Sequence, residues 1–141
     1  MKTDLETAGL VRRLLAMSYD LMLVVAVIMI GSLLFLVLTG GEVVEGSMRI
    51  VFQVYLLLLT VGFFGFFWIR GGQTLGMRAW RLQLIRPDGG RIDTLLVVRR
   101  LAAGIVTLGP LGLITVPFHP RGLSLTDMLA GTLIRQQPKP D

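Results

Sequence analysis

Residues 8–38, AGLVRRLLAMSYDLMLVVAVIMIGSLLFLVL, decide the fold of this chain. From Leu21 to Leu38 the stretch contains no charged residue. A helix rises about 1.5 Å per residue, so these positions cover roughly 27 Å, close to the thickness of bilayer hydrocarbon. We therefore predict a transmembrane helix over about residues 14–38. A second apolar run predicts another helix over about residues 48–69.

The composition agrees with a membrane protein. Of the 141 residues, 53% are hydrophobic and 16% are charged, whereas soluble proteins contain about 25% charged residues. The length suits a single domain, residues 1–141. The chain has no cysteine, which excludes disulfides, thiolate metal sites and cysteine nucleophiles. With His119 as the only histidine, too few ligands remain for a zinc site, and we expect no metal, cofactor or catalytic residue.

The charges predict the orientation in the membrane. The loop at residues 70–94 is rich in arginine, whereas the turn between the two spans carries Glu42 and Glu45. The positive-inside rule then places the N-terminus and the basic loop in the cytoplasm, and the acidic turn outside. The formal charge of +5 borders the apolar runs, so we expect contact with the bilayer and with anionic lipid headgroups, and no nucleic-acid binding. The arginines expected to contact headgroups are Arg70, Arg78, Arg81, Arg99 and Arg100.

The basic loop contains a pattern typical of a β-strand. Residues 79–86, AWRLQLIR, alternate apolar and polar side chains, and Pro87-Asp88-Gly89-Gly90 follows as a turn signal. Residues 91–93 could return as a second strand. We predict a small β-hairpin on the cytoplasmic side of the membrane.

A third apolar segment, about residues 95–118, is broken at Gly109-Pro110. Arg99 and Arg100 give its first half a basic flank, as in helices that lie in the membrane interface. Two arrangements are open. The segment either crosses once as a kinked helix, placing the tail at residues 119–141 outside, or enters the membrane and returns to the cytoplasm. The predicted fold class is an all-α polytopic membrane protein with two full transmembrane helices, the hairpin and this broken segment.

Charged residues beside the first apolar run need partners. Arg13 and Asp20 stand seven residues apart, which places them on one helix face. An ionisable group near hydrocarbon costs about 3 kcal/mol, so it normally faces protein, water or an opposite charge. Arg13 could pair with Asp20 or with Asp127 of the tail.

Three blocks of sequence resemble the RDD family of small bacterial membrane proteins, which is named for one arginine and two aspartates. The blocks are AGLVRRLLAMSYDL, GGQTLGMRAWRLQLIRPDGGRI and RGLSLTDMLAGTLI. The resemblance assigns the arginine to Arg13 and the two aspartates to Asp20 and Asp127. The sequence departs from the family pattern at Met77, where lysine is more usual, and at Thr126, where histidine often precedes the aspartate.

Two functions remain open for the charged cluster of Arg13, Asp20 and Asp127. The first is structural: an assembly or accessory component that associates with itself or with another membrane protein. The alternative is implied by the resemblance, because sodium(potassium)/proton antiport has been proposed for a few members of the family. An antiporter of this size would act as an oligomer through Asp20 and Asp127, whose carboxylates would exchange a proton for a cation. We do not expect an enzyme.

Overall fold

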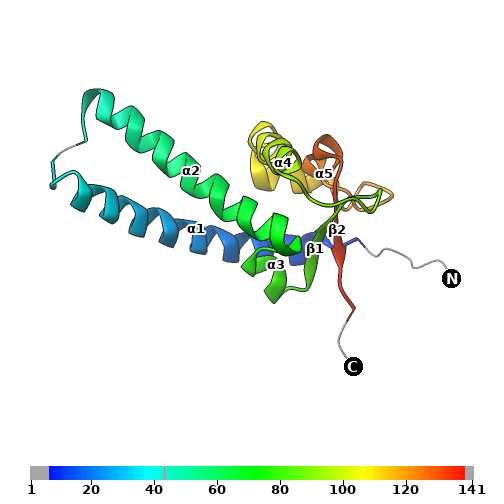
Figure 1. Cartoon of the computed structure of the whole chain (residues 1–141). Coiled ribbons are helices and arrows are strands. Elements are labelled where there is room, and N and C mark those ends of the chain that lie inside the picture. Colours follow the sequence, from blue (N-terminus) through cyan, green and yellow to red (C-terminus); the bar gives the residue numbers. More distant parts are fainter. Residues whose placement is uncertain (1–6, 43, 139–141) are drawn as a thin grey trace.

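Two long helices dominate the computed structural model, which describes residues 7–42 and 44–138. Helix α1 (Leu10–Leu38) and helix α2 (Gly46–Gly71) run antiparallel as a long pair (Figure 1). Both are long and apolar enough to cross a membrane. The prediction of two transmembrane helices is confirmed, although α1 begins before residue 14 and includes Arg13 within its first turns.

The two spanning helices pack through a small number of close contacts. The Tyr55 hydroxyl donates a hydrogen bond to the Gly31 carbonyl, 3.1 Å away. The ring of Phe35 lies 5.0 Å from that of Phe52 and 5.4 Å from that of Tyr55, measured between centroids. A Cβ at Gly31 would overlap Cδ1 of Leu59, so a larger residue here would require the Leu59 side chain to move. The outward faces carry exposed apolar side chains, as expected for helices that contact lipid.

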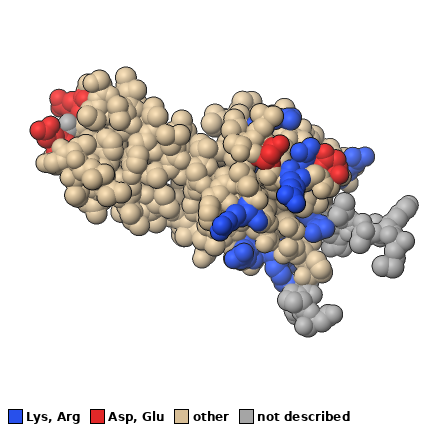
Figure 2. Space-filling view, viewed as in Figure 1, with Lys and Arg blue, Asp and Glu red and all other residues tan. Residues whose placement is uncertain are grey.

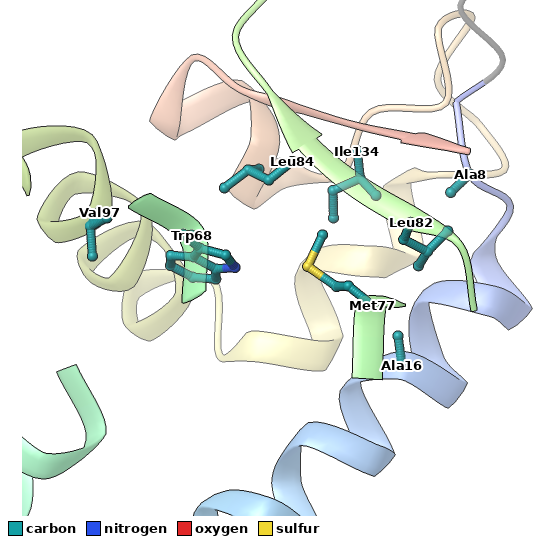
Figure 3. Close-up of a cluster of buried hydrophobic side chains, with 8 residues drawn as sticks. All are labelled: Ala8, Ala16, Trp68, Met77, Leu82, Leu84, Val97 and Ile134. Atoms are coloured by element: carbon teal, nitrogen blue, oxygen red, sulfur yellow. The ribbon is translucent and has the colours of Figure 1, made fainter. Parts of the chain in front are cut away.

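Residues 72–138 form a compact unit, which we call the end module, at the end of the pair where α1 begins (Figure 1). Its elements are α3 (Leu75–Ala79), β1 (Leu82–Ile85), α4 (Thr94–Val106), the 3₁₀ helix η1 (Gly109–Thr115), α5 (Leu125–Ala130) and β2 (Leu133–Gln136). Its core also includes side chains from the start of α1, from the residues just before it, and from the end of α2 (Figure 3). The buried residues of this core are Ala8, Ala16, Trp68, Met77, Leu82, Leu84, Val97 and Ile134.

The two-stranded sheet is present, but the predicted hairpin is wrong. Strand β1 pairs antiparallel with β2 from the C-terminal tail, with Leu84 opposite Ile134, and residues 91–93 form no strand. Two physical reasons explain the difference. Leu84 and Ile134 are both buried in the same core, whereas Ile92 packs against that core only partly buried. In addition, the Asp93 side chain accepts a hydrogen bond from the Leu96 amide at 2.8 Å and so caps α4.

The third apolar segment does not continue in one direction. Helix α4 and η1 meet at 86°, and α4 lies crosswise to the α1–α2 pair in Figure 1. Its 13 residues reach about 20 Å, short of the roughly 30 Å of a hydrocarbon core. Exposed apolar side chains on this segment include Ile105, Val106 and Phe118, which suits a position in the membrane interface.

The sheet holds β2 beside the basic loop. Strand β2 pairs with β1, and its Ile134 carbonyl accepts a hydrogen bond from the Ala8 amide at 3.1 Å. Strand β2 therefore lies beside the segments that precede α1 and follow α2. By length and composition the bent pair α4–η1 suits either a broken span or a re-entrant segment. The pairing of β2 with β1 favours the second of the two arrangements considered from the sequence, which stays a prediction.

Candidate functional site

Asp127 lies at the centre of a buried charged cluster in the end module. It occupies the first turn of α5, where Ser124 and Asp127 cap the helix reciprocally. The Asp127 amide donates to the Ser124 hydroxyl at 3.1 Å, and the Ser124 amide donates to Oδ2 of Asp127 at 3.2 Å. A six-residue helix has little stability of its own. This cap fixes its start and holds the carboxylate toward the interior of the protein.

Arg13 reaches this carboxylate from α1. Its Nη1 donates to Oδ2 of Asp127 at 2.5 Å, its Nη2 to the Gly122 carbonyl at 3.0 Å and its Nε to the Ala8 carbonyl at 2.9 Å. The side chain is 1% exposed. Of the two partners considered for Arg13, Asp20 and Asp127, the structure pairs it with Asp127. Every nitrogen of the guanidinium has an acceptor, which a buried arginine requires.

Arg100 completes the cluster from α4. Its Nη1 donates to Oδ1 of Asp127 at 2.9 Å and to the Thr132 hydroxyl at 2.5 Å. The guanidinium carbon also lies 5.5 Å from the centre of the Trp68 ring. The prediction that Arg100 contacts lipid headgroups is wrong, because its side chain is buried. We call Arg13, Arg100 and Asp127 the Asp127 cluster.

Helical spacing could have identified the role of Arg100. The buried residues of α4 are Leu96, Val97, Arg100 and Ala103, which recur at the intervals of a single helix face. Arg99 lies off this stripe and is exposed. Of the two arginines predicted to form a basic flank, only Arg100 shares the face of the buried apolar residues.

The electrostatics of the cluster favour an ionised carboxylate. Burial acts to raise the pKa of the Asp127 carboxyl, but the charges of Arg100 and Arg13 outweigh it and hold the pKa below its ordinary value. Two permanent cations and one anion leave the cluster with a net charge of +1 at neutral pH. Its chemistry is that of a fixed ionic junction between α1, α4 and α5.

Asp20 lies apart from this cluster. Its Oδ2 accepts a hydrogen bond from the Thr74 hydroxyl, and its Oδ1 accepts one from the Gly76 amide at 2.9 Å. Thr74 also caps α3 by accepting from the Met77 amide at 3.2 Å. The structure therefore separates the three predicted residues: Arg13 and Asp127 are joined, whereas Asp20 binds the start of α3.

Gly76 explains why α3 can approach α1 so closely. A Cβ at this position would overlap the Ala16 carbonyl oxygen and lie 2.9 Å from Oδ1 of Asp20. Only glycine lets the backbone amide reach the Asp20 carboxylate. The sequence Thr74-Leu75-Gly76 thus supplies a cap, a turn and a close approach.

The other arginines predicted to contact headgroups lie at the surface. Arg70, Arg78 and Arg99 are exposed, and Arg81 is partly buried. Figure 2 shows the basic side chains gathered over the end module, with acidic residues at the opposite tip, where the turn between α1 and α2 carries Glu42 and Glu45. Contact of the four arginines with lipid headgroups stays a prediction.

Two surface cavities lie in the end module, and neither is lined by Arg13, Asp20 or Asp127. Among residues 7–42 and 44–138, no group of histidine, cysteine, aspartate and glutamate side chains is arranged to hold a metal ion. The two buried carboxylates are therefore bonded to protein groups and stand apart from both cavities.

A comparison with protein families adds to this geometry. The model described as the RDD family matches residues 7–131, a range that contains Arg13, Asp20 and Asp127. No curated protein and no solved structure matches the chain.

Proposed function

The chain belongs to the RDD family, and we propose that it serves as a structural or accessory component of the bacterial inner membrane. In this proposal the α1–α2 pair anchors the protein in lipid, and the Asp127 cluster fixes the end module against that anchor. The end module would then offer a rigid surface at the membrane to a second copy or to another membrane protein.

The proposal rests on the hydrogen bonds that both oxygens of the Asp127 carboxylate accept from protein groups. Both of its oxygens accept hydrogen bonds from arginines, at 2.5 Å from Arg13 and 2.9 Å from Arg100. An exchanger needs a carboxylate that releases its proton to bind a cation and then takes the proton back. A carboxylate held between two guanidinium groups favours neither step. Fixation of α5 and β2 is the role that this geometry supports best.

The distribution of charge supports an orientation for this component. The acidic turn lies at one end of the α1–α2 pair, and most of the arginines lie at the other (Figure 2). Under the positive-inside rule the end module and both ends of the chain would be cytoplasmic. Anionic headgroups of the inner leaflet would then meet Arg78, Arg81 and Arg99.

One observation favours cation/proton antiport as the second candidate. Asp20 belongs to a spanning helix, and no arginine or lysine of the described ranges lies within salt-bridge distance of it. The Thr74 hydroxyl beside it is a neutral oxygen of the kind that binds sodium. Two spanning helices cannot enclose a pathway alone, so this function would require an oligomer in which Asp20 faces a shared cavity.

Proteoliposomes distinguish the two candidates. Wild-type protein is reconstituted with a pH-sensitive dye inside the vesicles, and sodium or potassium is added outside. The structural proposal expects no cation-dependent change of internal pH. A sodium/proton ionophore added at the end shows that the vesicles hold a gradient.

The matched variant is Asp20→Asn, which keeps the shape of the side chain and one acceptor for the Gly76 amide. A cation-dependent flux in wild type that disappears in this variant, while its thermal stability in detergent persists, would replace the structural proposal by antiport. Asp127→Asn serves as the comparison, because it should loosen the end module without creating or abolishing a flux.

A further inference from the structure

A cavity of about 720 Å³ opens where α2 ends. Its wall is formed by the last residues of α2, by β1 and the loop that follows it, and by Arg135 of β2. This volume falls in the range of about 300–1,000 Å³ typical of sites for small molecules. Four arginines line the cavity, and we call it the arginine pocket: Arg70, Arg86, Arg91 and Arg135.

The charge of the arginine pocket is not balanced by its own wall. No aspartate or glutamate is among the residues that line it. Arg86 is neutralised from outside by Asp88, whose Oδ2 lies 2.7 Å from Nη2. The other three arginines have no carboxylate within salt-bridge distance among the residues that the structure describes. Three uncompensated cations around one concave space attract an anion, and the planar guanidinium group matches phosphate.

The surroundings of the pocket distinguish a lipid from a soluble anion. Ile69 lines the pocket and is 48% exposed, and Phe66, one turn earlier on α2, is 54% exposed. The Arg70 guanidinium lies 5.1 Å from the centre of the Phe66 ring. The pocket is thus continuous with the apolar surface of a spanning helix. A phospholipid whose chains lie along α2 would carry its phosphate to Arg70 and its headgroup into the cavity.

We propose that the arginine pocket binds the phosphate and headgroup of an anionic phospholipid. Arg70 holds the phosphate at the mouth, Arg91 and Arg135 face the headgroup, and Ile69 contacts the start of the acyl chains. A soluble phosphate would use the arginines alone and would gain nothing from Ile69 or Phe66. This site is independent of whether the protein is a structural component or an antiporter.

The test compares two double variants of equal charge. Arg70→Gln/Arg91→Gln removes two pocket arginines whose side chains make no hydrogen bond to the described residues. The Arg91 backbone carbonyl, which accepts a hydrogen bond from Arg86 at 3.4 Å, is kept. Arg12→Gln/Arg121→Gln removes two other arginines, one partly exposed and one exposed, that do not line the pocket. Native mass spectrometry of the protein in detergent measures the binding of phosphatidylglycerol and of phosphatidylcholine with the same acyl chains.

Wild-type protein should prefer phosphatidylglycerol to phosphatidylcholine. Each pocket arginine should contribute about fivefold to this binding, equivalent to about 1 kcal/mol, so the pocket variant should bind phosphatidylglycerol about 25-fold more weakly. The control variant should change by less than about twofold, because single exposed charges contribute little at a distance. Arg70→Lys/Arg91→Lys keeps both charges and should retain most of the binding.

Three results would overturn the proposal. Equal binding of the two lipids by wild type would show that the pocket does not select an anion. Equal weakening in both glutamine variants would show diffuse attraction to the whole basic surface. Displacement of the lipid by inorganic phosphate or by glycerol phosphate at concentrations similar to that of the lipid would assign the pocket to a soluble phosphate compound instead.

Discussion

The substitution Asp127→Asn tests whether the buried charges hold the end module to the spanning helices. Asparagine has the shape of aspartate and retains one oxygen acceptor. It removes the negative charge shared by Arg13 and Arg100, and it places an amide donor where one of the two guanidinium groups now donates. When the asparagine NH₂ group points at the Ser124 backbone N–H, the hydrogen bond that this N–H now donates to Asp127 is lost. The change therefore acts on charge with almost no change in volume.

The structure sets the size of the effect. The exposed fractions of the Arg13, Arg100 and Asp127 side chains are 1%, 9% and 0%, so water cannot replace the lost anion without opening the structure. Removing one partner from a buried ion pair costs about 3–5 kcal/mol. The α1–α2 pair remains in the membrane in either case. The cost should therefore appear as release of α5 and β2 and not as unfolding of the whole chain.

Hydrogen–deuterium exchange in nanodiscs measures this release locally. Peptides covering residues 124–136 report the amides of α5 and β2, and peptides from the middle of α1 serve as an internal reference. A cost of at least 3 kcal/mol should accelerate exchange in residues 124–136 by roughly 150-fold or more. Exchange in the middle of α1 should not change.

The matched control is Asp88→Asn, which removes the carboxylate of an exposed ion pair. Asp88 is bound to Arg86 at 2.7 Å, but its side chain is 59% exposed. Water can solvate both partners once they separate, so exchange should not change measurably. If the two variants exchange at equal rates in residues 124–136, the Asp127 cluster does not attach the tail and the reasoning is refuted.

Three further predictions concern the same contacts. Gly76→Ala should lower stability in detergent by about 3 kcal/mol, because its Cβ overlaps the Ala16 carbonyl, whereas Gly62→Ala, with nothing within 4 Å of the added atom, should leave the melting temperature unchanged. Arg100→Gln should lower stability by about 3 kcal/mol through the buried Asp127 charge, and Arg99→Gln should not; equal melting temperatures would contradict the assignment of Arg100 to the core. Burial acts to raise the pKa of Asp127, but the charges of Arg100 and Arg13 outweigh it and hold the pKa below its ordinary value. The protection factors of residues 124–136, which are corrected for the intrinsic pH dependence of amide exchange, should therefore be constant above about pH 4 and fall as the pH decreases through the lowered pKa.

The spanning helices could be predicted because their signal is contained within each segment. No charged residue interrupts residues 21–38, and in hydrocarbon each backbone N–H must find its acceptor within the same helix. The ends of the spans were less certain. The predicted start near residue 14 is late, because α1 begins at Leu10 and includes Arg13, whose guanidinium is buried against Asp127.

The partner of β1 could not be read from residues near it. Alternation over residues 79–86 indicated the strand, which forms at residues 82–85, and the turn signal at residues 87–90 favoured pairing with the next few residues. The turn does form locally, since the Gly90 amide donates to Oδ1 of Asp88 at 2.8 Å. Strand pairing, however, depends on which segment adds apolar surface to the same face, and Ile134 does so from about fifty residues away. Periodicity gives no information on contacts at that separation.

Sequence spacing predicted the shared helix face of Arg13 and Asp20, but it could not identify their binding partners. The buried residues of α1 are Arg13, Ala16, Asp20, Val24 and Gly31, which recur at the intervals of a single face. Spacing thus placed Arg13 and Asp20 correctly on that face, but two helical turns are too far apart for the two side chains to satisfy each other while both also bind other elements. Each one instead fixes a different part of the end module. Arg13 binds α5 through Asp127, and Asp20 binds the start of α3 through Thr74 and Gly76. Further along the same face, the Gly31 carbonyl accepts a hydrogen bond from Tyr55 of α2. Helix α1 therefore contacts α2, α3 and α5 along one face.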